Sequence, residues 1–338
     1  MAPPILLSPT STLLISSAFT TSYVASVYLL PHTRIQLSPP QPSVPPVDLA
    51  AGAAPSPTAD ATAIPPPPPD RHRDRNHPAV IRARLCAVSL SSLTSALSIP
   101  YIIRYFSTSS SPPPLPPLHR LLGFALPSTL KQLGTLIALP LGLTASLFAG
   151  SLYITWLCGG MPGQRHWSWR GAKAEYGGWE GVRNLVVGPL TEEIVFRSCI
   201  VAVSALAGLS KKQIVFLSPL YFGIAHVHHA YETYVAGGRT KQALTRGVLQ
   251  TTFQFTYTTL FGWYATFLYL RTGSLLPPFL AHSYCNLMGL PPLHWALLEF
   301  PERKLSLWGT YLAGIATFIY GFWRWTEPAL YGGSAWWW

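Results

Sequence analysis

The stretch Pro189-Leu190-Thr191-Glu192-Glu193-Ile194-Val195-Phe196-Arg197 places two adjacent carboxylates and an arginine inside a long apolar run. This run extends from about residue 182 to residue 209, which is enough to cross a bilayer. Of the twelve Asp and Glu residues in the chain, only these two lie in such a run. A charged side chain at the centre of a bilayer costs at least about 2.5 kcal/mol, and such residues usually face a cavity and have a function. We therefore expect the functional site to be built around this segment.

The composition indicates a polytopic membrane protein. Charged residues make up 10% of the 338 residues and hydrophobic residues 49%, whereas soluble domains contain about 25% charged residues. Several apolar runs reach the roughly 20 residues that a transmembrane helix needs. We predict an all-α transmembrane bundle, with the third span interrupted at Pro140. About eight spans are expected, at residues 11–30, 85–103, 133–157, 182–209, 213–229, 248–270, 277–290 and 305–322.

The net charge of +11 does not indicate nucleic-acid binding, because the basic residues are spread over many short loops. The predicted loops 31–83, 158–183, 229–246 and 291–305 contain more Lys and Arg than the loops on the opposite side. By the positive-inside rule these four loops lie in the cytosol, and both termini lie across the membrane. The four cysteines are isolated and form no CxxC pair, so we expect neither disulfides nor a structural zinc site.

The carboxylates and the arginine of the fourth span differ in the directions in which they point. Glu193 and Arg197 are four residues apart and share a helix face, so we expect them to form an ion pair. Glu192 is rotated by about 100° from Glu193 and lacks that partner, which suits it to act as a general base. The alternative is that all three residues form a polar cluster that only fixes the packing.

Histidines occur at the end of the fifth predicted span. The segment 222–229 reads Phe-Gly-Ile-Ala-His-Val-His-His, and Phe222 precedes His226 by four residues. His226 is the deepest of the three histidines, whereas His228 and His229 lie nearer the following loop. Because two buried glutamates precede it, we interpret His226 as a candidate for chemistry.

The seventh predicted span contains His282 and Asn286, four residues apart and therefore on one helix face. An imidazole and an amide on one ridge can donate hydrogen bonds to a developing oxyanion. Cys285 is adjacent to Asn286 but lies off the His282 face, so we expect it to have a packing role.

Together these polar residues supply what peptide hydrolysis needs, a base that activates water and donors that hold the tetrahedral intermediate. Zinc chemistry is an alternative, in which Glu192, His226 and His282 would leave one coordination position open. A second alternative is a proton-coupled transporter, although no internal repeat is visible. A third is a catalytically silent scaffold whose Pro-rich loop binds partners, and the full set of polar residues argues against it.

The chain contains three motifs in order, Glu-Glu-x-x-x-Arg at 192–197, Phe-x-x-x-His at 222–226 and His-x-x-x-Asn at 282–286. In this combination it resembles the type II CAAX prenyl endopeptidases, the Ras-converting enzymes, within the superfamily of CAAX and bacteriocin-processing membrane proteases. The segments 222–229 and 273–289 resemble the eukaryotic branch in particular. The resemblance extends over roughly residues 183–292 and does not include the Pro-rich segment.

The resemblance implies a glutamate protease of the endoplasmic reticulum membrane whose active site is accessible from the cytosol. Such an enzyme removes the last three residues from proteins that are prenylated on a C-terminal CaaX cysteine, without a cofactor or catalytic metal. The expected partners are farnesylated or geranylgeranylated CaaX proteins, such as Ras-like small GTPases, and membrane lipids. A related protease that cleaves peptides without a prenyl group is the remaining alternative.

The resemblance also assigns roles to the motif residues. It implies that Glu192 and His226 activate the water and that His282 and Asn286 stabilise the oxyanion. Glu193, Arg197 and Phe222 are expected to support the site. If the enzyme is metal-dependent, the ligands would be the zinc set named above.

These expectations divide the chain into five segments. They are a first span (1–30), a flexible Pro-rich loop (31–83), transmembrane helices with an interfacial Trp-rich loop (84–181), the catalytic transmembrane core (182–292), and the last span with the C-terminal tail (293–338). Because the substrate carries a lipid, we expect the bundle to open sideways to the bilayer.

Overall fold

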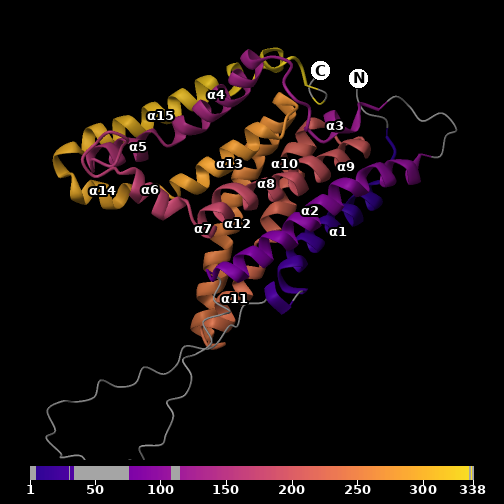
Figure 1. The fold of residues 1–338 in the computed structure, drawn as a ribbon, viewed down its shortest axis with the longest axis horizontal. Helices are drawn as coiled ribbons and strands as arrows, with labels where there is room; N and C mark the ends of the chain where they lie inside the picture. Colours follow the sequence, from indigo (N-terminus) through magenta and orange to yellow (C-terminus); the bar gives the residue numbers. More distant parts are fainter. Residues whose placement is uncertain (1–4, 30, 34–75, 108–114, 335, 337–338) are drawn as a thin grey trace, which may run out of the picture.

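The computed structural model describes residues 5–29, 31–33, 76–107, 115–334 and 336. All regular elements in this part of the chain are helices, and no strand occurs in it. The predicted all-α class is therefore confirmed (Figure 1). Most of the predicted Pro-rich loop lies outside the described residues.

Two groups of helices flank a central group (Figure 1). One flank is the pair α1 (Pro9–Leu29) and α2 (Pro78–Phe106), which pack along each other. The other flank contains α4 (Leu130–Leu147), α5 (Ala149–Leu157) and α15 (Lys304–Arg324).

The central group carries the three motifs. It is formed by α8 (Gly188–Glu193), α9 (Ile200–Leu206), α10 (Lys211–Ala225), α12 (Lys241–Thr272) and α13 (Leu276–Met288). Smaller helices complete the fold: α3 (Leu118–Leu121), α6 (Trp169–Tyr176), α7 (Trp179–Gly181), α11 (His228–Ala236) and α14 (Leu293–Glu299). Short 3₁₀ turns lie at Pro31–Thr33, Pro301–Arg303 and Pro328–Tyr331.

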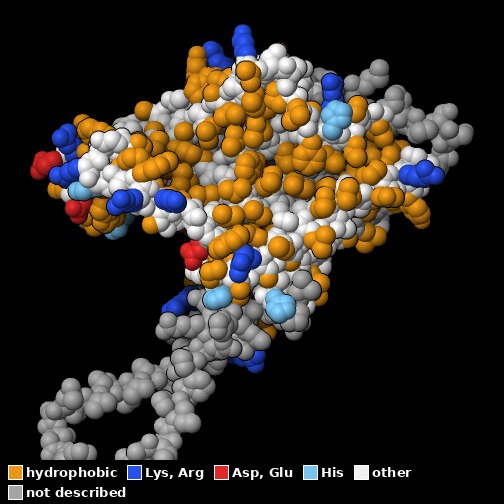
Figure 2. Space-filling model, in the orientation of Figure 1, with side chains coloured by type: hydrophobic (Ala, Val, Ile, Leu, Met, Phe, Trp, Pro, Cys, Tyr) orange, Lys and Arg blue, Asp and Glu red, His pale blue; other side chains and the backbone are white. Residues whose placement is uncertain are grey.

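Four helices within the described ranges are long and apolar enough to cross a membrane. They are Pro9–Leu29, Pro78–Phe106, Leu130–Leu147 and Pro301–Arg324. Apolar side chains cover much of the visible helical body, and Lys and Arg lie mainly toward its edges (Figure 2). The protein is therefore a multi-pass membrane bundle, and the number of eight spans stays a prediction.

The predicted fourth span forms one continuous helical rod whose winding changes along its length. Wide π turns at Val182–Val187 and Ile194–Cys199 lie on either side of α8, which carries both glutamates. A Cβ atom on Gly188 would lie 2.4 Å from the carbonyl oxygen of Arg183, so the first wide turn requires a glycine there. Such local π winding is rare and is frequent at functional sites.

Two predicted helix boundaries were wrong. The third span is not interrupted at Pro140, because α4 continues through this residue and the break occurs at Phe148. The fifth span ends at Ala225, and His226 is the residue that caps it. The segment 229–246, expected as a polar loop, is mostly helical, because α11 covers its first part and α12 begins at Lys241.

The packing of α15 on α4 and α5 depends on Gly314. A Cβ atom there would lie 2.2 Å from the carbonyl oxygen of Ser146, whereas a Cβ atom on Gly309 of the same helix would meet nothing within 4 Å. We expect Gly314→Val to lower the free energy of unfolding by about 1–3 kcal/mol, because the helices must move apart. Gly309→Val, the matched control, should leave stability nearly unchanged. Unfolding in mixed detergent micelles measures both, and equal effects would contradict this packing role.

Candidate active site

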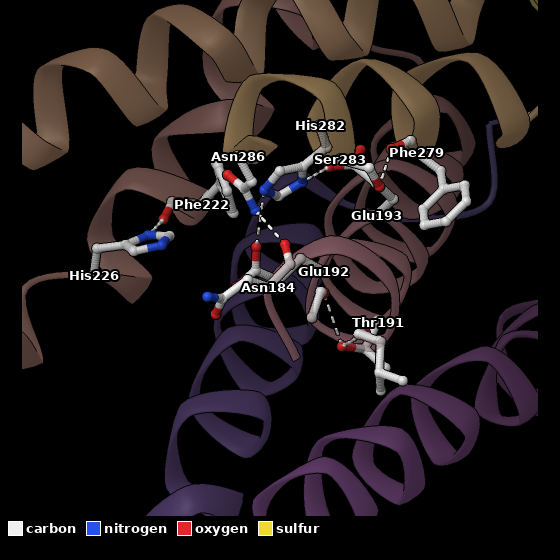
Figure 3. Close-up of polar contacts among 12 residues, drawn as sticks. Asn184, Thr191, Glu192, Glu193, Phe222, His226, Phe279, His282, Ser283 and Asn286 are labelled. Carbon is white, nitrogen blue, oxygen red and sulfur yellow. Dashed lines mark hydrogen bonds and ion pairs between the residues drawn. The ribbon is translucent and has the colours of Figure 1, made fainter. Parts of the chain in front are cut away.

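The buried carboxylate of Glu193 contacts both Arg197 of the first motif and His282 of the third. The Nε atom of Arg197 lies 3.1 Å from Oε2 of Glu193, as the four-residue spacing predicts. The other carboxylate oxygen, Oε1, lies 2.7 Å from Nδ1 of His282 (Figure 3). Because the Glu193 side chain is completely buried, its carboxylate has a fixed position and orients the imidazole of His282.

Aromatic rings cover the guanidinium of Arg197. The ring centre of Phe222 lies 4.4 Å from its central carbon and that of Phe261 lies 5.6 Å away. Rings near a cation stabilise it in the absence of water. Phe222 also packs edge-on against His226, at 4.8 Å between ring centres. The phenylalanine of the second motif therefore connects the buried cation to the histidine that follows it.

Glu192 points into the open part of the site, in contrast to Glu193. Its side chain is 22% exposed, and its Oε2 atom lies 3.5 Å from Nε2 of His282. The sequence correctly separated the directions of the two glutamates, but it did not predict that Glu192 approaches the histidine of the third motif. His282 therefore lies between two carboxylates, one buried and one facing the cavity.

His226 occupies the end of α10. This helix begins with a capping box formed by Ser210 and Gln213. At its other end, Nδ1 of His226 lies 2.8 Å from the carbonyl oxygen of Phe222. Because a carbonyl only accepts hydrogen bonds, Nδ1 carries the proton, and Nε2 of the neutral ring is an acceptor. This arrangement fixes one tautomer.

Asn286 lies one turn beyond His282 on α13, which ends at Met288 and is capped by Gly289. Its Nδ2 group donates a hydrogen bond of 2.9 Å to the backbone carbonyl of Asn184, in the first wide turn (Figure 3). An amide nitrogen has two hydrogens, so this bond orients the group and leaves a second donor. The roles of Asn184 and Phe261 were not predicted, and nothing in the motif spacing indicates either.

One cavity of about 1750 Å³ collects the predicted catalytic residues, since Glu192, His226, His282 and Asn286 all line it. Its wall also includes apolar residues of α1 and α2 on one side and aromatic residues of α12 and α15 on the other. Cys285, expected to have a packing role, lies on the wall as well. All four cysteines are free, as expected.

The three residues considered as zinc ligands line one cavity, but their ligand atoms do not all lie within 4.8 Å of one another. Within the described ranges, the group of His, Cys, Asp or Glu residues whose ligand atoms all lie within 4.8 Å consists of His228, His229 and Glu232. Hydrogen bonds join this group internally and to α1, because Glu232 accepts from Tyr28 at 2.6 Å and lies 2.9 Å from Nδ1 of His229. Glu192, His226 and His282 form no such group.

Comparison with known proteins agrees with the motifs. Residues 176–288 match the family of type II CAAX prenyl endopeptidases, Rce1-like. The probable CAAX prenyl protease 2 of Schizosaccharomyces pombe is 35% identical, over 83% of this chain and 82% of the relative. This chain belongs to the type II CAAX prenyl endopeptidase family. It is thus a CAAX protease.

Other CAAX prenyl proteases match similarly. The human CAAX prenyl protease 2 is 37% identical, over 76% of this chain and 75% of the relative. The Arabidopsis thaliana CAAX prenyl protease 2 is 38% identical, over 45% of this chain and 46% of the relative. No solved structure matches this chain.

Proposed function

We propose that this CAAX protease removes the C-terminal aaX tripeptide from prenylated CaaX proteins with a water molecule activated by Glu192. The observation that carries the proposal is the common cavity that Glu192, His226, His282 and Asn286 line. The completely buried Glu193 and Arg197 lie behind these residues and hold His282. The partly exposed glutamate is therefore assigned to catalysis, and the buried one to support.

Glu192 and His226 together can prepare a water molecule for attack on the carbonyl carbon of the prenylated cysteine. Glu192 has no ion pair with Arg197 and reaches the cavity, so its carboxylate can accept the proton of the water. The Nε2 atom of neutral His226 is an acceptor because Nδ1 donates to Phe222. It can therefore orient the same water by accepting its other hydrogen.

His282 and Asn286 can stabilise the oxyanion that the attack produces. With Nδ1–H donated to Glu193, Nε2 of His282 is a donor when the ring is protonated, and the two glutamates supply the opposite charge. The second amide hydrogen of Asn286 can donate to the same oxygen. Removing one donor from such a site typically costs 10²–10³-fold in kcat. The proton held by Glu192 then passes to the leaving amine of the aaX peptide.

The apolar flanks of the cavity support a prenylated substrate. The side chains of Tyr23, Val24, Val27 and Leu85 lie on one flank, and those of Tyr264 and Phe318 lie on the other. A prenyl chain buried against such side chains gains about 25 cal/mol for each Å² of apolar surface removed from water. We further propose that the enzyme resides in the endoplasmic reticulum membrane and opens to the cytosol, which the family and the positive-inside rule support.

Matched farnesylated and unmodified CaaX peptides test this function. We expect the full-length protein in lipid nanodiscs to release the aaX tripeptide from the farnesylated peptide, as identified by mass spectrometry, at least tenfold faster than from the unmodified one. Equal rates would indicate a related protease without prenyl specificity. Activity should also survive a strong chelator. Loss on chelation and recovery with zinc would instead support the zinc alternative.

A further inference from the structure

The substrate of the proposed reaction ends in a free carboxylate three residues beyond the scissile bond, so this inference rests on the proposed function. A carboxylate inside an apolar cavity is costly unless a cation or several hydrogen-bond donors hold it. Apart from histidines, the basic side chains on the described part of the cavity wall are Arg84, Arg183, Lys211 and Lys212. Geometry distinguishes among these four.

The two lysines are too far from the catalytic residues. They lie at the beginning of α10, and His226 caps its opposite end. Fourteen residues of helix separate Lys212 from His226, which corresponds to about 21 Å. An extended tripeptide spans only about 10 Å. Arg84 lies on α2, where its Nε donates to the carbonyl of Thr33 at 2.8 Å, toward the α1 side of the cavity.

Arg183 is at a matching distance. It precedes Glu192 by nine residues on the same helical rod, which corresponds to about 13 Å along the axis. The extended aaX segment and the length of the arginine side chain together cover this distance. Gly188 lies between Arg183 and Glu192 on the cavity wall and presents no side chain. The backbone of a peptide can therefore lie along this face, from Glu192 toward Arg183.

Local contacts orient the guanidinium of Arg183. Its Nε donates to Oδ1 of Asn184 at 2.9 Å, and its Nη1 donates to Oδ1 of Asn76 at 3.1 Å. The backbone carbonyl of Asn184 also accepts the hydrogen bond of Asn286. One short segment thus connects the guanidinium to the proposed oxyanion site. We propose that Arg183 binds the C-terminal carboxylate of the aaX segment and thereby sets the register of cleavage.

Paired peptides with the same sequence, one ending in a free carboxylate and one in a carboxamide, test the assignment. With farnesylated versions of both, we expect wild type to cleave the acid with a kcat/KM at least tenfold higher than the amide, because charged hydrogen bonds are the stronger ones. Arg183→Gln should lower the ratio of the acid kcat/KM to the amide kcat/KM to about one. Arg183→Lys should recover part of the preference. Arg82→Gln removes an exposed charge nearby and should keep the wild-type ratio.

Each other outcome has a distinct meaning. Equal cleavage of acid and amide by wild type would overturn the carboxylate site and leave the protease function standing. Equal loss on both peptides in Arg183→Gln would show a structural role and also overturn it. If Arg84→Gln lost the preference for the acid over the amide and Arg183→Gln kept it, the carboxylate would be assigned to Arg84. Cleavage of neither peptide by wild type would overturn the proposed function itself.

Discussion

Glu192→Gln is expected to lower kcat for a farnesylated CaaX peptide by about 10³-fold, within the 10²–10⁴-fold range of general base catalysis. The amide has nearly the same size as the carboxylate but cannot accept the proton of the attacking water. The side chain is partly exposed to the cavity, so the substitution leaves no charge buried without a partner. We therefore expect KM to change by no more than a few-fold. Steady-state cleavage of the peptide in nanodiscs measures both constants.

The matched control for this prediction is Glu299→Gln, which changes an exposed glutamate on α14 outside the cavity. It should have wild-type kcat. Activity of Glu192→Gln within tenfold of wild type would contradict the role of Glu192 as the base. A large rise in KM with unchanged kcat would assign Glu192 to substrate binding, because such a change reports lost uniform binding.

The contacts that the sequence predicted correctly are those within one helix. Glu193 and Arg197 are four residues apart, and this spacing places them on one side of the helical rod, 3.1 Å apart, even across the wide turn at Ile194–Cys199. The rotation of about 100° per residue in a helix likewise points Glu192 and Glu193 in different directions. These predictions required no knowledge of how the helices pack, because helix geometry sets the angle between neighbouring side chains.

The contacts that the sequence did not predict lie between helices. His282 meets the glutamates across a separation of about ninety residues, and the distance depends on how α13 packs against α8. Phe261 reaches Arg197 from α12 and belongs to no motif. The carbonyl of Asn184 is a backbone group, so residue type gives no sign of its role. Interhelical packing, and not residue pattern, determines all three.

The misplaced helix boundaries have a local physical origin. Proline lacks an N–H group and is expected to break a helix in water. At Pro140 the helix continues, although the missing N–H leaves the carbonyl of Leu136, four residues earlier, without its usual backbone donor. In transmembrane helices neighbouring helices, hydroxyl side chains or local changes of winding satisfy such a freed carbonyl, so a proline does not have to end the helix. By contrast, neither proline nor glycine occurs among residues 226–236, so residue type does not mark the end of α10 at Ala225.

Arg197→Met is expected to lower the free energy of unfolding by about 3–5 kcal/mol, because it leaves the carboxylate of Glu193 buried without its cation. Both side chains are almost fully inaccessible, so water cannot replace the lost partner. Arg324→Met is the matched control: this arginine is exposed on α15 and contacts the hydroxyl of Tyr320 at 2.8 Å. It should change stability by no more than about 0.5 kcal/mol. Unfolding in mixed detergent micelles provides the comparison.

The double variant Glu193→Gln/Arg197→Met separates stability from catalysis. Each single substitution leaves one buried charge without its partner, whereas the double variant removes both charges. The double variant should therefore cost less than the sum of the two single substitutions, with a coupling of about 1–3 kcal/mol. Stability should therefore recover, whereas cleavage should stay at least tenfold below wild type, because a neutral amide at 193 no longer supplies the charge that orients and stabilises His282. Additive costs would contradict the ion pair. Wild-type cleavage by the double variant would show that Glu193 does not act through His282, and the buried pair would then serve packing alone.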